Sequence, residues 1–67
     1  MILITKNKEI HTVTKFKLDN WTGLEIRDDH SNYFTIQDYE TREEAQKVLE
    51  SIADTVATQG HNAVIIL

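Results

Sequence analysis

Apolar residues recur at helical spacing between Thr41 and Gly60 and predict one long amphipathic helix. The stripe consists of Ala45, Val48, Leu49, Ile52, Ala53 and Val56. These positions lie three or four residues apart, so they line one side of a helix. Thr41 and Glu44 have the spacing of a capping box at the start, and Gly60 stands where a left-handed cap is expected. We expect this helix to cover one face of a small sheet.

Five other segments are short, apolar or alternating, and they predict β-strands. They cover Met1–Thr5, Ile10–Leu18, Trp21–Arg27, Tyr33–Tyr39 and Ala63–Leu67. Polar turns separate the first four, which is typical of hairpins. The chain of 67 residues is therefore expected to form a single α+β domain, residues 1–67. Its predicted order is ββββαβ: a four-stranded antiparallel β-meander, one amphipathic helix packed on one face of the sheet, and a C-terminal strand.

The strand pattern also predicts which side chains face the helix. The expected inner face contains Ile2 and Ile4 or their neighbours, Phe16, Leu18, Leu24, Ile26, Phe34, Ile36, Val64 and Ile66. Val13 interrupts the alternation of the second strand, which indicates a bulge or a locally covered outer face. Gly23, inside the third strand, weakens that strand or lets another group come close.

The first and last strands are apolar on both faces, and this pattern predicts assembly. A run without alternation is typical of a strand covered on both sides. A single helix covers only one side, so Leu3, Ile65 and Leu67 would otherwise face water. We expect a homo-oligomer, a dimer or larger, whose interface contains Leu3, Val13, Ile65 and Leu67. Fraying of the last residues, or a loop folded over them, is the alternative interpretation.

Composition narrows the classes of function. The chain has no cysteine, which excludes disulfides and thiolate metal sites. No nucleophile motif, glycine-rich phosphate loop or paired-histidine metal motif is present, so we expect a non-enzymatic protein without cofactor or metal. The segment Asp28-Asp29-His30 offers cation-ligand types, but the spacing of a calcium-binding loop is missing and a polar turn is the favoured interpretation. With neither cysteine nor an export signal, the expected location is the cytoplasm, without a membrane association.

Charge is unevenly distributed along this acidic chain of net charge −4. Residues 1–18 carry +3 and residues 19–67 carry −7. The overall sign argues against general nucleic-acid binding, but the middle strands collect cations and aromatic rings on their predicted outer face. The expected ligand-binding residues are Lys15, Lys17, Trp21, Arg27, Tyr33, Gln37 and Tyr39. Such a mixture suits a nucleotide-like ligand, although an ordinary solvated sheet face has the same composition.

The junction between the fourth strand and the helix follows several hairpin strands and contains a pattern of eight positions: Tyr39, Thr41, Glu43, Glu44, Ala45, Val48, Leu49 and Ile52. This pattern resembles one found in short bacterial and bacteriophage proteins. This resemblance transfers no binding residues. It implies a small cytoplasmic protein, encoded by a bacterium or a phage, of a kind that often acts by binding.

Three functions follow as hypotheses. The first is a phage-type anti-defence protein that sequesters a nucleotide-like immune signal. The second is a protein–protein inhibitor that docks on a host defence enzyme through its acidic helix or a sheet edge. The third is a small structural or regulatory subunit without a ligand.

Overall fold

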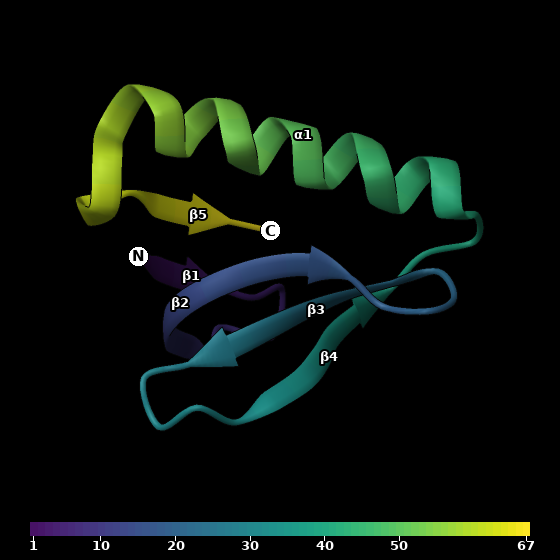
Figure 1. Cartoon of the computed structure of the whole chain (residues 1–67), viewed down its shortest axis with the longest axis horizontal. Helices are drawn as coiled ribbons and strands as arrows, with labels where there is room; N and C mark the ends of the chain where they lie inside the picture. Colours follow the sequence, from purple (N-terminus) through teal and green to yellow (C-terminus); the bar gives the residue numbers. More distant parts are fainter.

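The computed structural model describes all 67 residues and shows a five-stranded sheet with one long helix on one of its faces (Figure 1). The strands are β1 (Ile2–Ile4), β2 (Ile10–Leu18), β3 (Gly23–Asp28), β4 (Tyr33–Asp38) and β5 (Val64–Ile66). The helix α1 spans Arg42–Gln59 and continues into a short 3-10 turn, η1 (Gly60–Asn62). The predicted α+β class and the order ββββαβ are confirmed.

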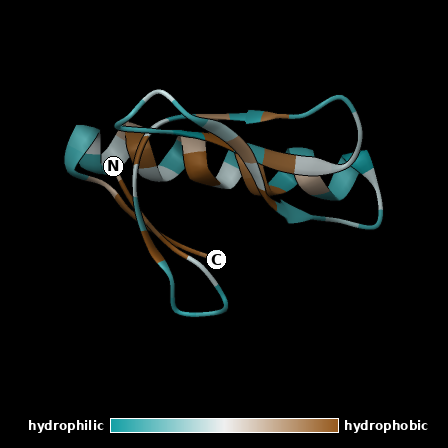
Figure 2. Cartoon of the chain, turned by 90° about the horizontal axis from the view of Figure 1, so that it is seen from below, coloured by the Kyte–Doolittle hydropathy of each residue, from teal (hydrophilic) through white to brown (hydrophobic).

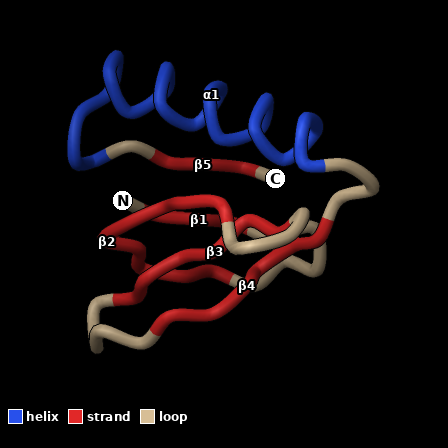
Figure 3. The backbone as a smooth tube through the Cα atoms, turned by 45° about the vertical axis from the view of Figure 1, so that its right-hand side comes forward, coloured by secondary structure: helices blue, strands red, loops and turns tan.

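The strands lie in the order β4-β3-β2-β1-β5. The first four form the predicted antiparallel meander, and β5 adds beside β1 in a parallel pairing. The crossover from β4 to β5 is provided by α1, which runs above β5 in both Figure 1 and Figure 3. The two ends of the chain therefore meet in neighbouring strands, with Leu3 opposite Ile65.

The helix begins and ends where the sequence predicts. The Thr41 hydroxyl accepts a hydrogen bond from the backbone N–H of Glu44 at 3.1 Å, which satisfies one of the free donors of the first turn. Gly60 adopts φ +75° and donates its N–H to the Val56 carbonyl, so glycine ends the helix without the steric cost of a side chain. Ala45 and Ile52 are buried against the sheet.

Two β-bulges decide which side chains face the helix. In β2, Val13 pairs with Asp28 but Lys15 pairs with Arg27, so Thr14 is an extra residue. In β4, Ile36 is extra in the same way, because the partners of Leu24 and Glu25 are two residues apart. A bulge shifts the alternation by one residue, so the two halves of each strand present opposite positions to the core. The irregularity predicted at Val13 is confirmed as a bulge.

The hydrophobic core lies between α1 and the inner face of the sheet. Its buried members are Leu3, Val13, Leu24, Ile26, Ile52, Ala63 and Ile65. Phe16, Phe34 and Ile36 pack against them, as predicted, and so does Leu67. This core is small, since only 10 of the 67 residues are buried.

The predicted facing of the two terminal strands is wrong. Leu3 and Ile65 lie in the core and Leu67 is partly buried, so none of them is left in water by the monomer. Val13 is also buried, because the bulge at Thr14 returns the β2 residues before it to the inner side. The four expected interface residues thus contribute to the core of a single chain, and the opposite positions of β1 and β5 point outward.

Candidate functional site

The face of the sheet away from α1, here called the outer face, has a cationic half and an apolar half. The cationic half is formed by Lys15, Lys17, Arg27 and Tyr33, where β2, β3 and β4 lie side by side. Lys15 is the direct cross-strand partner of Arg27, and Arg27 is that of Tyr33. Cross-strand partners share a face, so these side chains converge as the sequence predicts.

Tyr33 is the centre of the cationic half. The Lys17 ammonium lies 5.6 Å from the centroid of its ring, and the Arg27 guanidinium carbon lies 5.2 Å from it. A cation over an aromatic face is attracted by the negative π surface, which orients both side chains. Arg27 also donates to the Ser31 hydroxyl at 3.0 Å. The arrangement holds two long cationic side chains in defined positions.

The cations of this half are not equivalent. Lys17 forms an ion pair with Glu25 at 3.1 Å, which neutralises much of its charge locally. Lys15 and Arg27 make no ion pair. These two cross-strand neighbours therefore form the part of the outer face with positive charge free to bind an anion.

Trp21 lies at one end of this half, in the turn between β2 and β3. Its side chain is 78% exposed, so it neither belongs to the core nor packs against it. Together with Lys17, Asp19, Asn20, Glu25 and Thr35 it lines a shallow hollow of about 200 Å³. The hollow connects an exposed aromatic ring with the edge of the cationic half.

Asp19 holds this turn in place. Its carboxylate accepts hydrogen bonds from the backbone N–H groups of Trp21 (2.8 Å) and Gly23 (2.9 Å) and from the Thr35 hydroxyl (3.0 Å). The bonds from Gly23 and then Trp21 lower the pKa of Asp19 below its ordinary value. A Cβ atom on Gly23 would collide with this carboxylate and lie 2.6 Å from Thr35 Cγ2. The predicted close approach at Gly23 is therefore confirmed, and its partner is Asp19.

The start of α1 is tied to the same turn. The Arg42 guanidinium donates to the backbone carbonyls of Asp19 and Trp21, each at 2.7 Å. The helix terminus and the Trp21 turn thus form one connected unit. No sequence pattern predicts this contact, since the spacing of Arg42 places it on the solvated face of the helix.

Gln37 and Tyr39 do not belong to the cationic half. The bulge at Ile36 reverses the facing of the residues that follow it in β4. The side chains of Gln37 and Tyr39 therefore lie on the face of the sheet that α1 covers, where they line a groove between α1 and the sheet. Burial raises the pKa of the Tyr39 hydroxyl above its ordinary value. The predicted ligand set is thus divided: Lys15, Lys17, Arg27 and Tyr33 converge, Trp21 lies at their edge, and Gln37 and Tyr39 lie elsewhere.

The apolar half of the outer face was not predicted. It consists of the β-branched side chains of Ile2, Ile4, Ile10, Val64 and Ile66. Ile4 pairs with Ile10 on one side and Ile66 on the other, which makes a continuous row across three strands. Ile10 is 70%, Ile66 74% and Val64 44% exposed. Figure 2 shows both terminal strands as hydrophobic segments beside the N and C marks.

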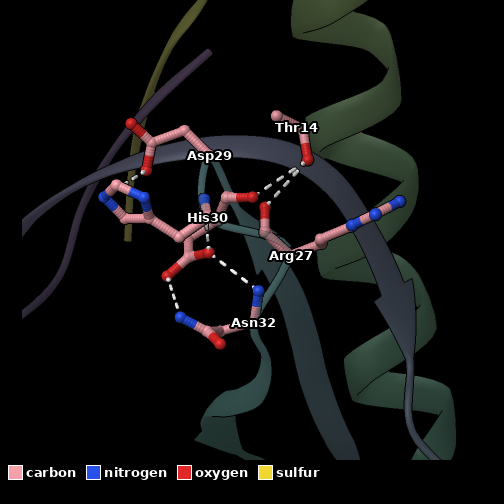
Figure 4. Close-up of polar contacts among 6 residues, drawn as sticks. Thr14, Arg27, Asp29, His30 and Asn32 are labelled. Carbon is pink, nitrogen blue, oxygen red and sulfur yellow. Dashed lines mark hydrogen bonds and ion pairs between the residues drawn. The ribbon is translucent and has the colours of Figure 1, made fainter.

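The loop between β3 and β4 is a hydrogen-bonded turn (Figure 4). One oxygen of Asp28 accepts from the backbone N–H groups of His30 and Asn32, each at 2.9 Å, and the other accepts from the Asn32 amide at 3.3 Å. The bond from the Asn32 backbone is the main cause that lowers the pKa of Asp28. The Asp28 carboxylate thus stabilises the loop through hydrogen bonds within it. The structure contains no group of three or more His, Asp or Glu side chains that could hold a metal ion. The polar-turn interpretation of this segment fits the structure.

Comparison of the chain with protein-family models, curated proteins and solved structures finds no match. The resemblance to short bacterial and bacteriophage proteins therefore stays a prediction. The single helix α1 lacks the apolar length needed to cross a bilayer.

Proposed function

We propose that this chain is a non-enzymatic binding protein that takes up a phosphorylated, nucleotide-like molecule on the cationic half of its outer face. The observation that carries the proposal is the cross-strand pair of Lys15 and Arg27, neither of which has a carboxylate partner. Two adjacent cations without a carboxylate partner match a phosphate group, which arginine binds through two parallel hydrogen bonds.

Aromatic groups beside these cations favour a ligand with a base. Trp21 offers an exposed ring, and Tyr33 lies between Arg27 and Lys17. Stacking of a base on an aromatic side chain contributes about 1–3 kcal/mol and does not require a particular base. A phosphate on Lys15 and Arg27 with a base toward Trp21 would use both kinds of group. Sequestration of a nucleotide immune signal by a phage-type protein is the biological role that the sequence resemblance suggests.

We further propose that two copies associate through the apolar half. Ile10 and Ile66 are exposed on either side of the half-buried Ile4, and leaving this row in water is costly. Two such β-branched surfaces pack well against each other. The small core of the monomer contributes little stability, and small domains of this kind are often stabilised by association. A second copy of the chain is a partner that is always present. Both halves lie on one sheet face, so the nucleotide site would border the dimer interface. If this face covers a host enzyme instead, the inhibitor hypothesis takes its place.

Intrinsic fluorescence of the single tryptophan provides a direct test. We expect nucleoside monophosphates, triphosphates or cyclic nucleotides to quench Trp21 with saturation, and the variant Lys15→Glu/Arg27→Glu to bind at least about tenfold more weakly, since two cations become anions. Lys47→Glu, an exposed change on α1, is the matched control and should leave affinity unchanged. Equal affinities of all three proteins would contradict a site at Lys15 and Arg27.

A further inference from the structure

The free edge of β5 presents backbone groups that no strand satisfies. At one end of β5 the Ile2 N–H donates to the Ala63 carbonyl (2.9 Å), and at the other the Leu67 N–H donates to the Ile4 carbonyl (3.0 Å). Backbone groups alternate in direction along a strand, so residues 63, 65 and 67 bond to β1 and those between them point away. The peptide groups of Val64 and Ile66 therefore face the open edge of the sheet.

One end of this edge is already occupied. The Val64 N–H donates to the side-chain oxygen of Gln59, at the end of α1, at 3.2 Å. The Val64 carbonyl and both the N–H and the carbonyl of Ile66 are left without a strand partner. An added strand could therefore accept a hydrogen bond from the Ile66 N–H and donate to the carbonyls of Val64 and Ile66. These three groups have the spacing of a β-ladder.

A groove of about 340 Å³ runs along the same edge. The three residues of β5 and the following Leu67 line it, although their side chains alternate in direction, so the groove faces the strand from its edge. Above it lies one stripe of α1, and across it lies the end of β4. The other lining residues are Lys6, Gln37, Tyr39, Val48, Ser51, Ile52 and Thr55.

The groove has one charged side chain. It belongs to Lys6, which follows β1 at the end where Ile4 pairs with Ile66. The remaining surface is apolar or carries neutral hydrogen-bonding groups such as those of Gln37 and Tyr39. An occupant with an acidic group near the Ile66 end and apolar side chains elsewhere would match this distribution.

We propose that this groove binds an extended acidic peptide segment of another protein, which adds to the sheet as a strand beside β5. The Ile66 N–H would donate to the peptide backbone, the carbonyls of Val64 and Ile66 would accept from it, and an aspartate or glutamate would pair with Lys6. Alternate side chains of the peptide would pack under Val48 and Ile52 of α1. A second copy of β5 is a poorer match, because residues 63–67 carry no acidic side chain for Lys6.

The probe is a synthetic eight-residue peptide of alternating valine and threonine with two aspartates at one end. We expect it to bind in the micromolar range, since β5 has only three residues. Hydrogen exchange of the Ile66 amide, followed by NMR, should slow at least about fivefold when the peptide is bound, as the amide enters a ladder. The same peptide with alternate amides N-methylated should not slow exchange at Ile66.

Two matched pairs locate the binding site. Lys6→Glu should weaken binding of the acidic peptide by about three- to tenfold, the range of an exposed ion pair that is reversed, whereas Lys8→Glu in the same turn should not. Ser51→Trp should fill the groove and abolish binding without touching the core, because Ser51 is exposed on α1. Asp54→Trp, also exposed on α1 but outside the groove, should bind like the unchanged protein.

Three results would overturn the proposal. The first is no change in exchange at Ile66 at millimolar peptide. The second is equal binding of the N-methylated peptide, which would show that the backbone edge is not used. The third is protection of the Ile66 amide that grows with protein concentration in an Ile10→Thr variant, whose outer-face dimer is weakened, because this would show that a second copy occupies the edge.

Discussion

His11 is a polar side chain that faces the core. It is the cross-strand partner of Leu3, and its ring centroid lies 5.6 Å from that of Phe34 in a tilted arrangement. Its Nε2 atom is buried and has no hydrogen-bond partner, since the nearest carboxylate oxygen, of Glu9, is 3.8 Å away. A buried polar atom without a partner loses its hydration and gains nothing in return.

Replacement of this histidine is therefore expected to stabilise the fold. His11→Leu should raise the free energy of unfolding by about 1 kcal/mol, because the unsatisfied nitrogen is replaced by apolar surface of similar size. Urea denaturation measures the change as a higher midpoint at an unchanged slope. His30→Leu, in the exposed loop after β3, is the control and should leave the midpoint where it is. A lower midpoint for His11→Leu would mean that the imidazole has a stabilising partner in solution.

Sequence reasoning at this scale succeeded where one residue type dictates one conformation. Thr41 and Gly60 were placed correctly because capping depends on a local hydroxyl and a local positive φ. The convergence of Lys15 with Arg27 was also predicted, since both lie in the regular part of the β2–β3 pairing. Arg42 was missed, because its two carbonyl acceptors belong to a turn more than twenty residues away.

At the scale of elements, the turn between β2 and β3 joins three strands and the helix. The Asp19 carboxylate binds the turn itself and reaches Thr35 in β4, while Arg42 binds the carbonyls of the same turn from α1. These contacts favour the ionised form of Asp19, which is why its pKa is lowered. The charge of one side chain therefore supports the junction of four elements.

This coupling predicts a pH dependence of stability. The pKa of Asp19 is lower in the folded protein than in the unfolded chain, where it is near 3.8. Such a carboxyl stabilises the fold at pH values above its unfolded-state pKa. This contribution is lost as the pH falls through its folded-state pKa. Asp19→Asn should reduce stability at pH 7 and flatten the loss of stability between about pH 5 and about pH 2. Thermal unfolding followed by circular dichroism across this range measures both effects.

The loss of stability between about pH 5 and about pH 2 is called the acid limb of the stability curve. Asp54→Asn, on the exposed side of α1, is the control for this experiment and should leave the acid limb unchanged. Part of the limb will persist in Asp19→Asn, because the pKa of Asp28 is lowered in the same direction. A limb that coincides with that of the unchanged protein would show that Asp19 does not stabilise the ionised fold.

The bulges explain why the element scale was only partly predictable. Element types, order and most bounds followed from periodicity, since β2 and α1 are long enough to display it. Val13 indicates an irregularity in β2 without locating the extra residue, Thr14, and nothing in the sequence indicates the extra residue Ile36 in β4. Each of these bulges inverts the facing of its strand. Gln37 and Tyr39 were assigned to the wrong face for this reason, and Val13 to an interface. In β1 and β5, every residue is apolar, so periodicity cannot choose between the two faces.

At the scale of the whole molecule, the outer face combines the surface that we propose for a phosphorylated ligand with the surface that we propose for a second copy. The cationic half lies over β2, β3 and β4, and the apolar half over β1, β5 and the start of β2. Strand β2 passes through both halves. The proposed ligand site and the proposed dimer interface therefore share one strand.

The dimer proposal makes a prediction about size. Ile10→Thr/Ile66→Thr should convert a dimer to a folded monomer, because both side chains are mostly exposed and threonine keeps the β-branched shape. Light scattering coupled to size exclusion measures the twofold drop in mass. Ile65→Thr is the contrasting change: it alters the core and should cost about 1–3 kcal/mol of stability. An unchanged protein that already has the mass of one chain would refute the dimer.

The bulge in β2 limits how this sequence can change in length. Thr14 stands opposite the Arg27–Asp28 peptide, and its hydroxyl reaches the carbonyls of both residues at 3.3 and 3.4 Å. Deletion of this one exposed residue would direct Lys15 and Lys17 toward the helix, or else turn His11 and Val13 out into water. During evolution, insertions and deletions should therefore be tolerated in the loop at Asp29–Ser31 and purged from the middle of β2, although Thr14 itself is free to be replaced by other residues.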